Sequence, residues 1–384
     1  MHGLPSITLL HANSLFSLSN DLERAEEVAG DVLDDERIYQ DNLVNFTLVG
    51  CRQNSDAVSQ TGPVEYSSLT FLLVLVDAAD QRRSISGKLA CQLVIFLSGA
   101  FEPDSTVCLH LFNDVLYPVL VLGILASRCR WTGTNPAYTT AELSHHFRIS
   151  KTRSVVTALE HLETVRTAVE SVDANIEILL FTDLLLTEEH CHRVAGLRTL
   201  HDLLRETTQS AKEPLTGLGQ IHNESIAALM ATSGTTGLPK MAARTHRSMI
   251  AELLAIAEDD SQKPYPVRRL LCTPSFHAFT APEMLFNALR LGRLTYIMRR
   301  FDESFAQKVQ DFRITEIFAP PAILSKLAKS SLDHDRFRTV RYVAYGGATL
   351  GPNLREQFLS LFTVQPRLTP VMIPIVNVLT FVLT

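Results

Sequence analysis

The sequence predicts an α/β protein built on mostly parallel sheets with helices on their faces. Short apolar runs alternate with helix-like stretches along the chain, glycine-rich turns follow directly after two of these runs, and no internal repeat is present. Strands that alternate with helices form parallel sheets, because each crossover helix covers one face of the sheet. Such sheets bind ligands at the carboxyl ends of their strands.

The composition is that of a globular protein with a large core. Hydrophobic residues make up 46% of the 384 residues and charged residues 20%, and this length favours two or three domains. The net charge of -6 gives no electrostatic reason to expect nucleic acid as a partner. The cysteines form no CxxC pair, which argues against a disulfide framework and a zinc ribbon. His190-Cys191-His192 is interpreted as a polar loop, and no metal site is predicted from protein ligands.

No segment is predicted to span a membrane. Residues 115–127 are apolar, but Asp114 and Arg128 bracket them and the segment is short for a span, so we expect a buried helix there. Two prolines interrupt the apolar tail from Leu368 to Thr384, which disfavours a stable helix. The N-terminus lacks the basic region of a signal peptide.

The first half of the chain yields four expected elements. Residues 1–66 show little periodicity, and no compact unit is assigned to them. From about Leu69 onward the apolar pattern becomes regular. Asn113-Asp114 is interpreted as the cap of the apolar helix that follows. The expected strands are 72–76 and 106–110, and the expected helices are 89–101 and the apolar segment after Asp114.

The alternation is clearer after about Glu224. The first strand there leads into a loop rich in Ser, Gly and Thr, and a helix is expected directly after that loop. Pro321 is expected to open a helix, where its fixed φ is favourable. The expected strands are 226–231, 270–272, 294–298, 314–319 and 340–345, and the expected helices are 246–256, 283–291, 305–312 and one from Pro321.

One loop carries the clearest chemical signal: Thr232-Ser233-Gly234-Thr235-Thr236-Gly237-Leu238-Pro239-Lys240. Its glycines let the backbone approach a ligand closely, its hydroxyls can donate to phosphate oxygens, and Lys240 supplies a compact positive charge. Successive backbone N–H groups would form an anion-binding concavity. The loop therefore suits a polyphosphate, with an ordinary surface turn as the alternative.

A Walker A loop of a phosphotransferase is the alternative from another enzyme class. Its pattern is GxxxxGK[ST]. Here Leu238 and Pro239 separate Gly237 from Lys240, and Met241 follows the lysine. The spacing therefore disfavours this class.

The loop resembles the signature loop of the adenylate-forming (AMP-binding) superfamily, which includes acyl-CoA synthetases and 4-coumarate–CoA ligase-like enzymes. The resemblance covers about residues 69–362, and Met241 and Thr349 depart from it where the family usually has glycine and proline. It implies the large N-terminal domain of the adenylate-forming fold. Further segments similar to family landmarks are 132–139 with Glu142-Leu143, Pro274-Ser275-Phe276-His277, Arg300-Phe301-Asp302, Ala319-Pro320-Pro321 and 345–351.

The resemblance implies a reaction. A substrate carboxylate attacks the α-phosphate of ATP, pyrophosphate leaves, and a thiol then displaces AMP from the acyl-AMP. The implied cofactors and partners are ATP, Mg²⁺, a small carboxylic acid, and coenzyme A or another thiol, with a carrier protein as a further acceptor.

The resemblance also implies the site residues. Lys240 and His277 take the catalytic roles, with His277 beside the carboxylate pocket. A core histidine is the alternative for His277, and an ordinary turn is the alternative for the second glycine-rich segment. Carried over by position, the phosphates would be held by Thr232, Ser233, Gly234, Thr235, Thr236, Gly237 and Lys240, and the adenine by Gly346, Gly347 and Ala348.

The same resemblance predicts an incomplete fold. The family continues after Phe362 into another strand and a YGxTE motif, and neither these nor the small C-terminal domain with its catalytic lysine is found in the sequence. The expected division is a poorly defined segment 1–66, a partial AMP-binding domain 67–364 and an atypical apolar tail 365–384. We therefore expect impaired acid activation and low solubility.

Two further expectations accompany this division. A non-catalytic nucleotide-binding or interaction protein on the same fold is the alternative function. The expected location is cytoplasmic; the family also includes peroxisomal members, but no peroxisomal tripeptide ends this sequence.

Overall fold

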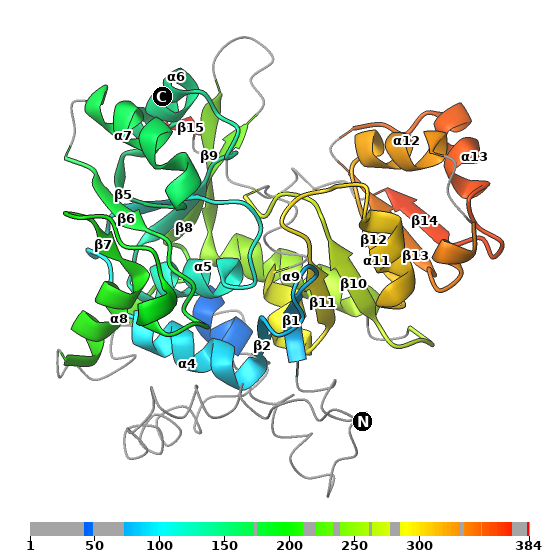
Figure 1. Ribbon diagram of the computed structural model, residues 1–384, viewed down its shortest axis with the longest axis horizontal. Coiled ribbons are helices and arrows are strands. Elements are labelled where there is room, and N and C mark those ends of the chain that lie inside the picture. Colours follow the sequence, from blue (N-terminus) through cyan, green and yellow to red (C-terminus); the bar gives the residue numbers. More distant parts are fainter. Residues whose placement is uncertain are drawn as a thin grey trace, which may run out of the picture.

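The chain folds into two sheets with helices between and around them, as the computed structural model shows (Figure 1). The larger sheet lies at the left of Figure 1 and the smaller at the right, with α9 in the region between them and α4 below the larger sheet. The structure describes residues 42–48, 73–172, 175–209, 220–232, 239–260, 263–276, 285–330, 334–346, 348–370 and 382–383.

The smaller sheet, called sheet A, has the order β14-β13-β12-β10-β11-β1-β2 within the described residues. Its neighbouring strands are parallel except for the pair β1 and β2. Its strands are β1 (Leu73–Asp77), β2 (Ser84–Ser86), β10 (Arg268–Leu271), β11 (Leu294–Ile297), β12 (Glu316–Phe318), β13 (Tyr342–Tyr345) and β14 (Arg367–Pro370).

The larger sheet, called sheet B, has the order β15-β9-β8-β4-β3-β5-β6-β7 over the same part of the chain. Strands β3 to β8 run parallel, whereas β9 is antiparallel to both β8 and β15. Its strands are β3 (Thr106–His110), β4 (Arg130–Gly133), β5 (Thr152–Thr157), β6 (Glu177–Leu180), β7 (Arg198–Thr199), β8 (Ile226–Thr232), β9 (Lys240–Thr245) and β15 (Val382–Leu383).

The helices fall into three layers. The inner layer shares one apolar core with the facing sides of both sheets and comprises α4 (Gly87–Leu97), α5 (Tyr117–Ala126), α8 (Leu200–Gln209), α9 (His246–Asp260) and α10 (Asn287–Leu291). The outer face of sheet B is covered by α6 (Thr140–Ser150) and α7 (Leu162–Glu170). The outer face of sheet A is covered by α11 (Phe305–Asp311), α12 (Pro321–Lys329) and α13 (Pro352–Leu359).

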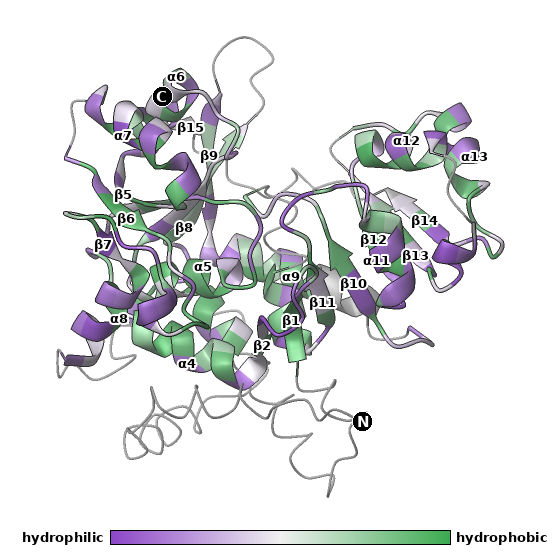
Figure 2. Cartoon of the chain, in the orientation of Figure 1, coloured by the Kyte–Doolittle hydropathy of each residue, from purple (hydrophilic) through white to green (hydrophobic). Residues whose placement is uncertain are grey.

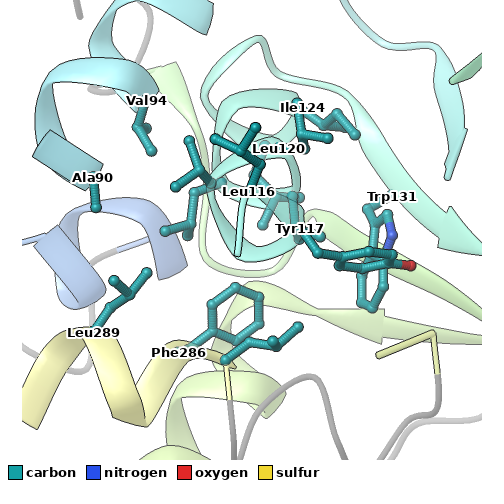
Figure 3. Packing of buried hydrophobic residues seen from close by; sticks show 14 of the residues in the cluster. Ala90, Val94, Leu116, Tyr117, Leu120, Ile124, Trp131, Phe286 and Leu289 are labelled. Atoms are coloured by element: carbon teal, nitrogen blue, oxygen red, sulfur yellow. The ribbon is translucent and has the colours of Figure 1, made fainter. Parts of the chain in front are cut away.

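Helix α5 is the centre of the inner layer. Every residue from Tyr117 to Ala126 is buried, and Figure 3 shows Leu116, Leu120 and Ile124 packed among side chains of α4 and the segment around Phe286. A helix buried on all sides needs no polar face. This explains the uncharged run in the sequence and confirms the buried helix predicted there. Figure 2 shows the contrast with the hydrophilic surface of α8.

Strand β3 shows why the central strands were recognisable from sequence. Val107 and Leu109 face the inner core, whereas Cys108 faces Leu143 and Phe147 of α6 on the other side. Successive side chains point to opposite faces, and both faces of this sheet are covered. The strand is therefore apolar throughout rather than alternating.

Two expectations about elements were wrong. The helix expected at 246–256 is confirmed by α9, which begins at His246, but the 232–240 loop leads into the strand β9 and not directly into that helix. The family's strand after Phe362 was expected to be missing, but β14 pairs in parallel with β13 and extends sheet A. Within the described residues, no helix has the length and apolar character that a membrane crossing requires.

Candidate functional site

The predicted phosphate loop connects the two strands of a hairpin. Thr232 ends β8, Lys240 begins β9, and the two residues face each other in the antiparallel register. The Thr232 hydroxyl donates to the Lys240 carbonyl at 3.2 Å, and both residues are exposed. The structure thus places a hydroxyl and an ammonium group at the base of the loop. The remaining predicted phosphate ligands, Ser233, Gly234, Thr235, Thr236 and Gly237, lie outside the described residues.

Helix α6 supports this hairpin from the outer face of sheet B. His145 and Ile149 lie four residues apart and therefore on one face of the helix. Ile149 packs against an apolar cluster of Leu229, Met241 and Ala243. The His145 Nε2–H donates to the carbonyl of Pro239 at 3.0 Å, just before Lys240. The exit of the loop is therefore tied to α6.

A second histidine of α6 reaches the entrance of the hairpin. The Thr132 hydroxyl on β4 donates to the Leu229 carbonyl of β8 at 2.7 Å, so its oxygen accepts from His146 Nε2 at 2.9 Å. Burial lowers the pKa of His146 to about 3, which keeps the ring neutral. The neutral ring with its proton on Nε2 is the form that this bond requires.

Sequence reasoning missed both histidines. It interpreted 132–143 only as a family landmark, although Thr139 and Glu142 form a capping box that starts α6. That T-x-x-E spacing would have predicted the helix and, with it, the common face of His145 and Ile149.

The Pro274-Ser275-Phe276 segment leaves sheet A after β10 and lies against the carboxyl ends of two strands of sheet B. Ser275 contacts Asn113, which follows β3, and Phe276 contacts Gly133 at the end of β4. His277, the predicted residue beside the carboxylate, lies outside the described residues. Its neighbours on the N-terminal side nevertheless fix where the chain approaches it.

The interpretation of Asn113 as a helix cap was wrong. α5 begins at Tyr117, and its N-cap residue, Leu116, makes no side-chain cap bond. The Asn113 side chain is buried and bonds to residues about 160 or more positions away along the chain. Only Asp114 acts near the helix start, where its Oδ1 accepts from the Leu116 N–H at 2.9 Å.

The second glycine-rich turn belongs to the other sheet. Gly346 follows β13 of sheet A and is half-buried, and Ala348 is exposed. Gly347 lies outside the described residues, and so does the predicted meeting of Lys240, His277 and Gly347 in one cleft. The turn does lie at the carboxyl end of a parallel strand, where the sequence predicted a ligand contact.

A cavity of about 530 Å³ opens where the carboxyl ends of strands from both sheets meet. Arg83 lies in its wall and pairs with Asp114 at 2.9 Å, with Asp183 at 2.7 Å and with Asp77. Burial raises the pKa of Asp114, and the Arg83 charge opposes this effect. Because Asp77 belongs to sheet A, and Asp114 and Asp183 follow strands of sheet B, this cluster joins the two sheets. No sequence motif pointed to it.

Among the described residues, no group of His, Cys, Asp or Glu side chains is arranged to hold a metal ion. The exposed Lys240 ammonium and the Thr232 hydroxyl fit a phosphate ligand, to which a divalent cation could bind through its oxygens.

Comparisons with known proteins identify the family of this chain. Residues 86–372 match the family described as AMP-binding enzyme. The chain is 49% identical over 301 residues to an acyl-CoA ligase from a Phoma species, covering 75% of this chain and 55% of that protein. It is 33% identical over 308 residues to a phenylacetyl-CoA ligase from Aspergillus niger, covering 78% and 56%. The chain thus spans about half the length of the curated relatives it matches.

Solved structures show the same fold. A luciferase from Phrixothrix hirtus aligns with a TM-score of 0.70 at 19% identity, over 85% of this chain and 60% of that chain. A benzoate CoA ligase from Burkholderia xenovorans aligns with a TM-score of 0.63 at 17% identity, over 85% and 60%. The two parallel-dominated sheets therefore correspond to the N-terminal domain of adenylate-forming enzymes.

Proposed function

Because this chain belongs to the family of AMP-binding enzymes, we propose that its residues serve the ATP-dependent activation of a carboxylic acid. A carboxylate oxygen attacks the α-phosphorus of ATP, the bond to pyrophosphate breaks, and acyl-AMP remains bound. The sulfur of coenzyme A or another thiol then attacks the acyl carbon and AMP leaves. A carrier protein is the alternative acceptor.

One observation carries this proposal: the β8–β9 hairpin holds Thr232 and Lys240 side by side at the base of the phosphate loop. Lys240 would pair with the β- and γ-phosphates, together with the loop residues Ser233 to Gly237. A bound Mg²⁺ would neutralise phosphate charge. The chain's own task at this step is to position the phosphates and to stabilise charge.

The other site residues are proposed on the same basis. By the family resemblance, His277 would lie beside the substrate carboxylate, and Gly346, Gly347 and Ala348 would contact the adenine through their backbone. Small residues suit that role because a planar ring must lie close to the main chain.

We also propose that residues 1–384 alone activate acids weakly. No YGxTE motif and no downstream catalytic lysine occur among them, and removing groups that act on one transition state together leaves little rate. Nucleotide binding without turnover is the alternative function, and it uses the same hairpin.

The Lys240→Ala variant tests the hairpin's role. We expect ATP–Mg²⁺ affinity to fall about 10- to 150-fold, because a charge-assisted contact worth about 1.5–3 kcal/mol is lost. Titration calorimetry measures the affinity, and Lys88→Ala on the surface of α4 serves as the matched control. Unchanged affinity in Lys240→Ala would remove the phosphate role.

Acid-dependent ATP–pyrophosphate exchange, screened over aromatic and fatty acids, tests the reaction. Binding of ATP without any exchange by residues 1–384 would support the nucleotide-binding alternative for these residues. Rapid exchange would contradict weak activation and would mean that other residues replace the missing motifs.

A further inference from the structure

The side chain of Asn113 forms four hydrogen bonds at the junction of the two sheets. Its Oδ1 accepts from the Ser275 N–H at 2.7 Å and from the Ser275 hydroxyl at 2.8 Å. Its Nδ2 donates to the carbonyls of Thr273 and Met298, both at 3.0 Å. Asn113 is only 6% exposed. Both N–H groups and both acceptor directions of the amide are thus used, and the partners define its orientation.

These bonds join three strand ends. Asn113 follows β3 of sheet B, Thr273 and Ser275 follow β10 of sheet A, and Met298 follows β11 of sheet A. The Asn113 N–H adds a bond to the Arg299 carbonyl at 3.3 Å. One amide therefore fixes the chain leaving β10 relative to sheet B.

Gly133 holds the same segment from the next strand. A Cβ at Gly133 would lie 2.6 Å from the Cβ and 3.1 Å from the Cα of Phe276, and 2.8 Å from the Tyr117 hydroxyl. The distances of 2.6 and 2.8 Å are shorter than a Cβ can tolerate, so β4 accepts Phe276 only because Gly133 has no side chain. Ser275 and Phe276 are therefore fixed by β3 and β4 together.

The position of these contacts connects them to the phosphate hairpin. Strand β4 lies between β3 and β8 in sheet B, and it pairs in parallel with β8, which carries Thr232. The fixed segment thus lies at the edge of the sheet where the phosphate loop begins. The next residue after Phe276 is His277, the proposed neighbour of the substrate carboxylate.

We propose that Asn113, assisted by Gly133, is a positioning residue for acid activation. It acts by fixing residues 273–276, and with them the approach of the chain to the carboxylate side of the site. ATP phosphates would be held by the β8–β9 hairpin, whose described residues make no bond to Asn113. This inference rests on the proposed function, and it predicts that loss of Asn113 weakens use of the acid much more than binding of ATP.

Asn113→Asp is the most direct test. The carboxylate keeps the shape of the side chain but cannot donate, so it turns an oxygen toward the Thr273 and Met298 carbonyls. Ser275→Ala removes one bond and keeps the N–H, and Gly133→Ala forces Phe276 away from β4. Asn353→Asp, an exposed residue of α13, is the matched control.

Two measurements are made on residues 1–384. Hydrogen exchange follows the backbone amides of Thr273, Ser275 and Phe276, and the concentration of phenylacetate or octanoate at half-maximal pyrophosphate exchange reports use of the acid. We expect Asn113→Asp and Gly133→Ala to lose amide protection in this segment and to need about tenfold more acid, with ATP affinity changed less than about threefold. Ser275→Ala should be intermediate between these variants and the wild-type chain, both in amide protection and in the acid concentration that it needs.

The outcomes separate this inference from the proposed function. Unchanged protection of 273–276 in Asn113→Asp, or equal losses of acid use and ATP affinity, would overturn the positioning role. If the wild-type chain binds ATP but shows no pyrophosphate exchange, the result counts against the proposed acid activation and not against the role of Asn113. Hydrogen exchange alone then decides whether Asn113 positions the segment: protection lost locally upholds it, and protection retained or lost throughout the chain rejects it.

Discussion

The bond from His145 to the Pro239 carbonyl predicts a measurable effect on nucleotide binding. His145→Ala removes the bond that ties the loop's exit to α6. A neutral hydrogen bond contributes about 0.5–1.5 kcal/mol, so ATP affinity should fall about two- to tenfold, less than in Lys240→Ala. Calorimetric titration with ATP–Mg²⁺ measures this. His145→Gln, which keeps a donor, should recover part of the affinity.

His192→Ala is a suitable control, because His192 is exposed and lies outside the hairpin. Equal ATP affinity of His145→Ala and the wild-type chain would show that the loop does not depend on α6.

Sequence reasoning could propose only site residues that are close together in the chain. Thr232 and Lys240 belong to one loop, whose glycines and hydroxyls identify it without any tertiary information. Asn113 and His145 were missed because their partners lie 162 and 94 residues away. An asparagine before a helix is more often a cap than a link between sheets, and only the packing of the two sheets distinguishes the two roles.

At the scale of elements, α6 depends on its capping box. The Thr139 hydroxyl accepts from the Glu142 N–H, and the Glu142 carboxylate accepts from the Thr139 N–H at 2.8 Å. Thr139→Ala removes an N-cap, which typically destabilises a protein by about 1 kcal/mol. Because α6 carries His145 and His146, the urea midpoint should fall and ATP affinity should weaken modestly.

Thr139→Ser keeps the cap and should behave like the wild-type chain in both measurements. A lower midpoint in Thr139→Ser equal to that of Thr139→Ala would mean that the methyl group, and not the cap, is responsible.

The stabilisation that the Glu142 hydrogen bonds contribute also depends on pH. Hydrogen bonds from Thr139 lower the pKa of Glu142, so its contribution is present above the ordinary glutamate pKa and is lost as the pH falls through the lowered value.

The burial of an element decides whether its sequence predicted it. β3 and α5 are covered on all sides, so their apolar runs are long enough to identify. β9 was missed because it carries Lys240 and the buried Arg244. Arg244 pairs with Glu252 of α9, and a charge inside a strand is tolerated only with such a partner. Glu252 lies eight residues after Arg244 in the next helix. The sequence alone does not show that these two side chains pair.

At the scale of the whole molecule, the two sheets depend on each other. They share one core around α5, and the Arg83 cluster and Asn113 join their strand ends. The predicted tail contributes to both sheets, since β14 extends sheet A and β15 pairs with β9 of sheet B. The domain boundaries at 67 and 364 stay predictions. Pairing of the tail depends on tertiary contacts that local sequence patterns do not contain.

Three of the buried histidines predict how the stability of this molecule depends on pH. Burial lowers the pKa of His110 to about 3, of His146 to about 3 and of His246 to about 4. In the unfolded chain each would titrate near its ordinary value of about 6.5. As the pH falls below that value, the unfolded chain takes up protons that the folded chain does not bind. The free energy of unfolding should therefore fall from about pH 6.5 toward pH 4, by up to about 1.4 kcal/mol per pH unit for each histidine.

His246→Asn isolates one of these contributions. His246 begins α9, and its Nδ1 accepts from the Leu43 N–H at 3.2 Å, a bond that an asparagine carbonyl can also accept. The variant should therefore keep much of the stability at pH 7.5 and lose less of it at pH 5.5 than the wild-type chain. Urea unfolding at pH 7.5, 6.5 and 5.5 measures the slopes of both proteins, and His192→Asn, at an exposed position, is the matched substitution control. Asp114, whose pKa is raised by burial, contributes to the pH dependence of stability with the opposite sign. The test is therefore the difference in slope between His246→Asn and the wild-type chain, and not the absolute slope of either protein. Equal slopes for His246→Asn and the wild-type chain would show that His246 binds a proton as readily in the folded protein as in the unfolded one.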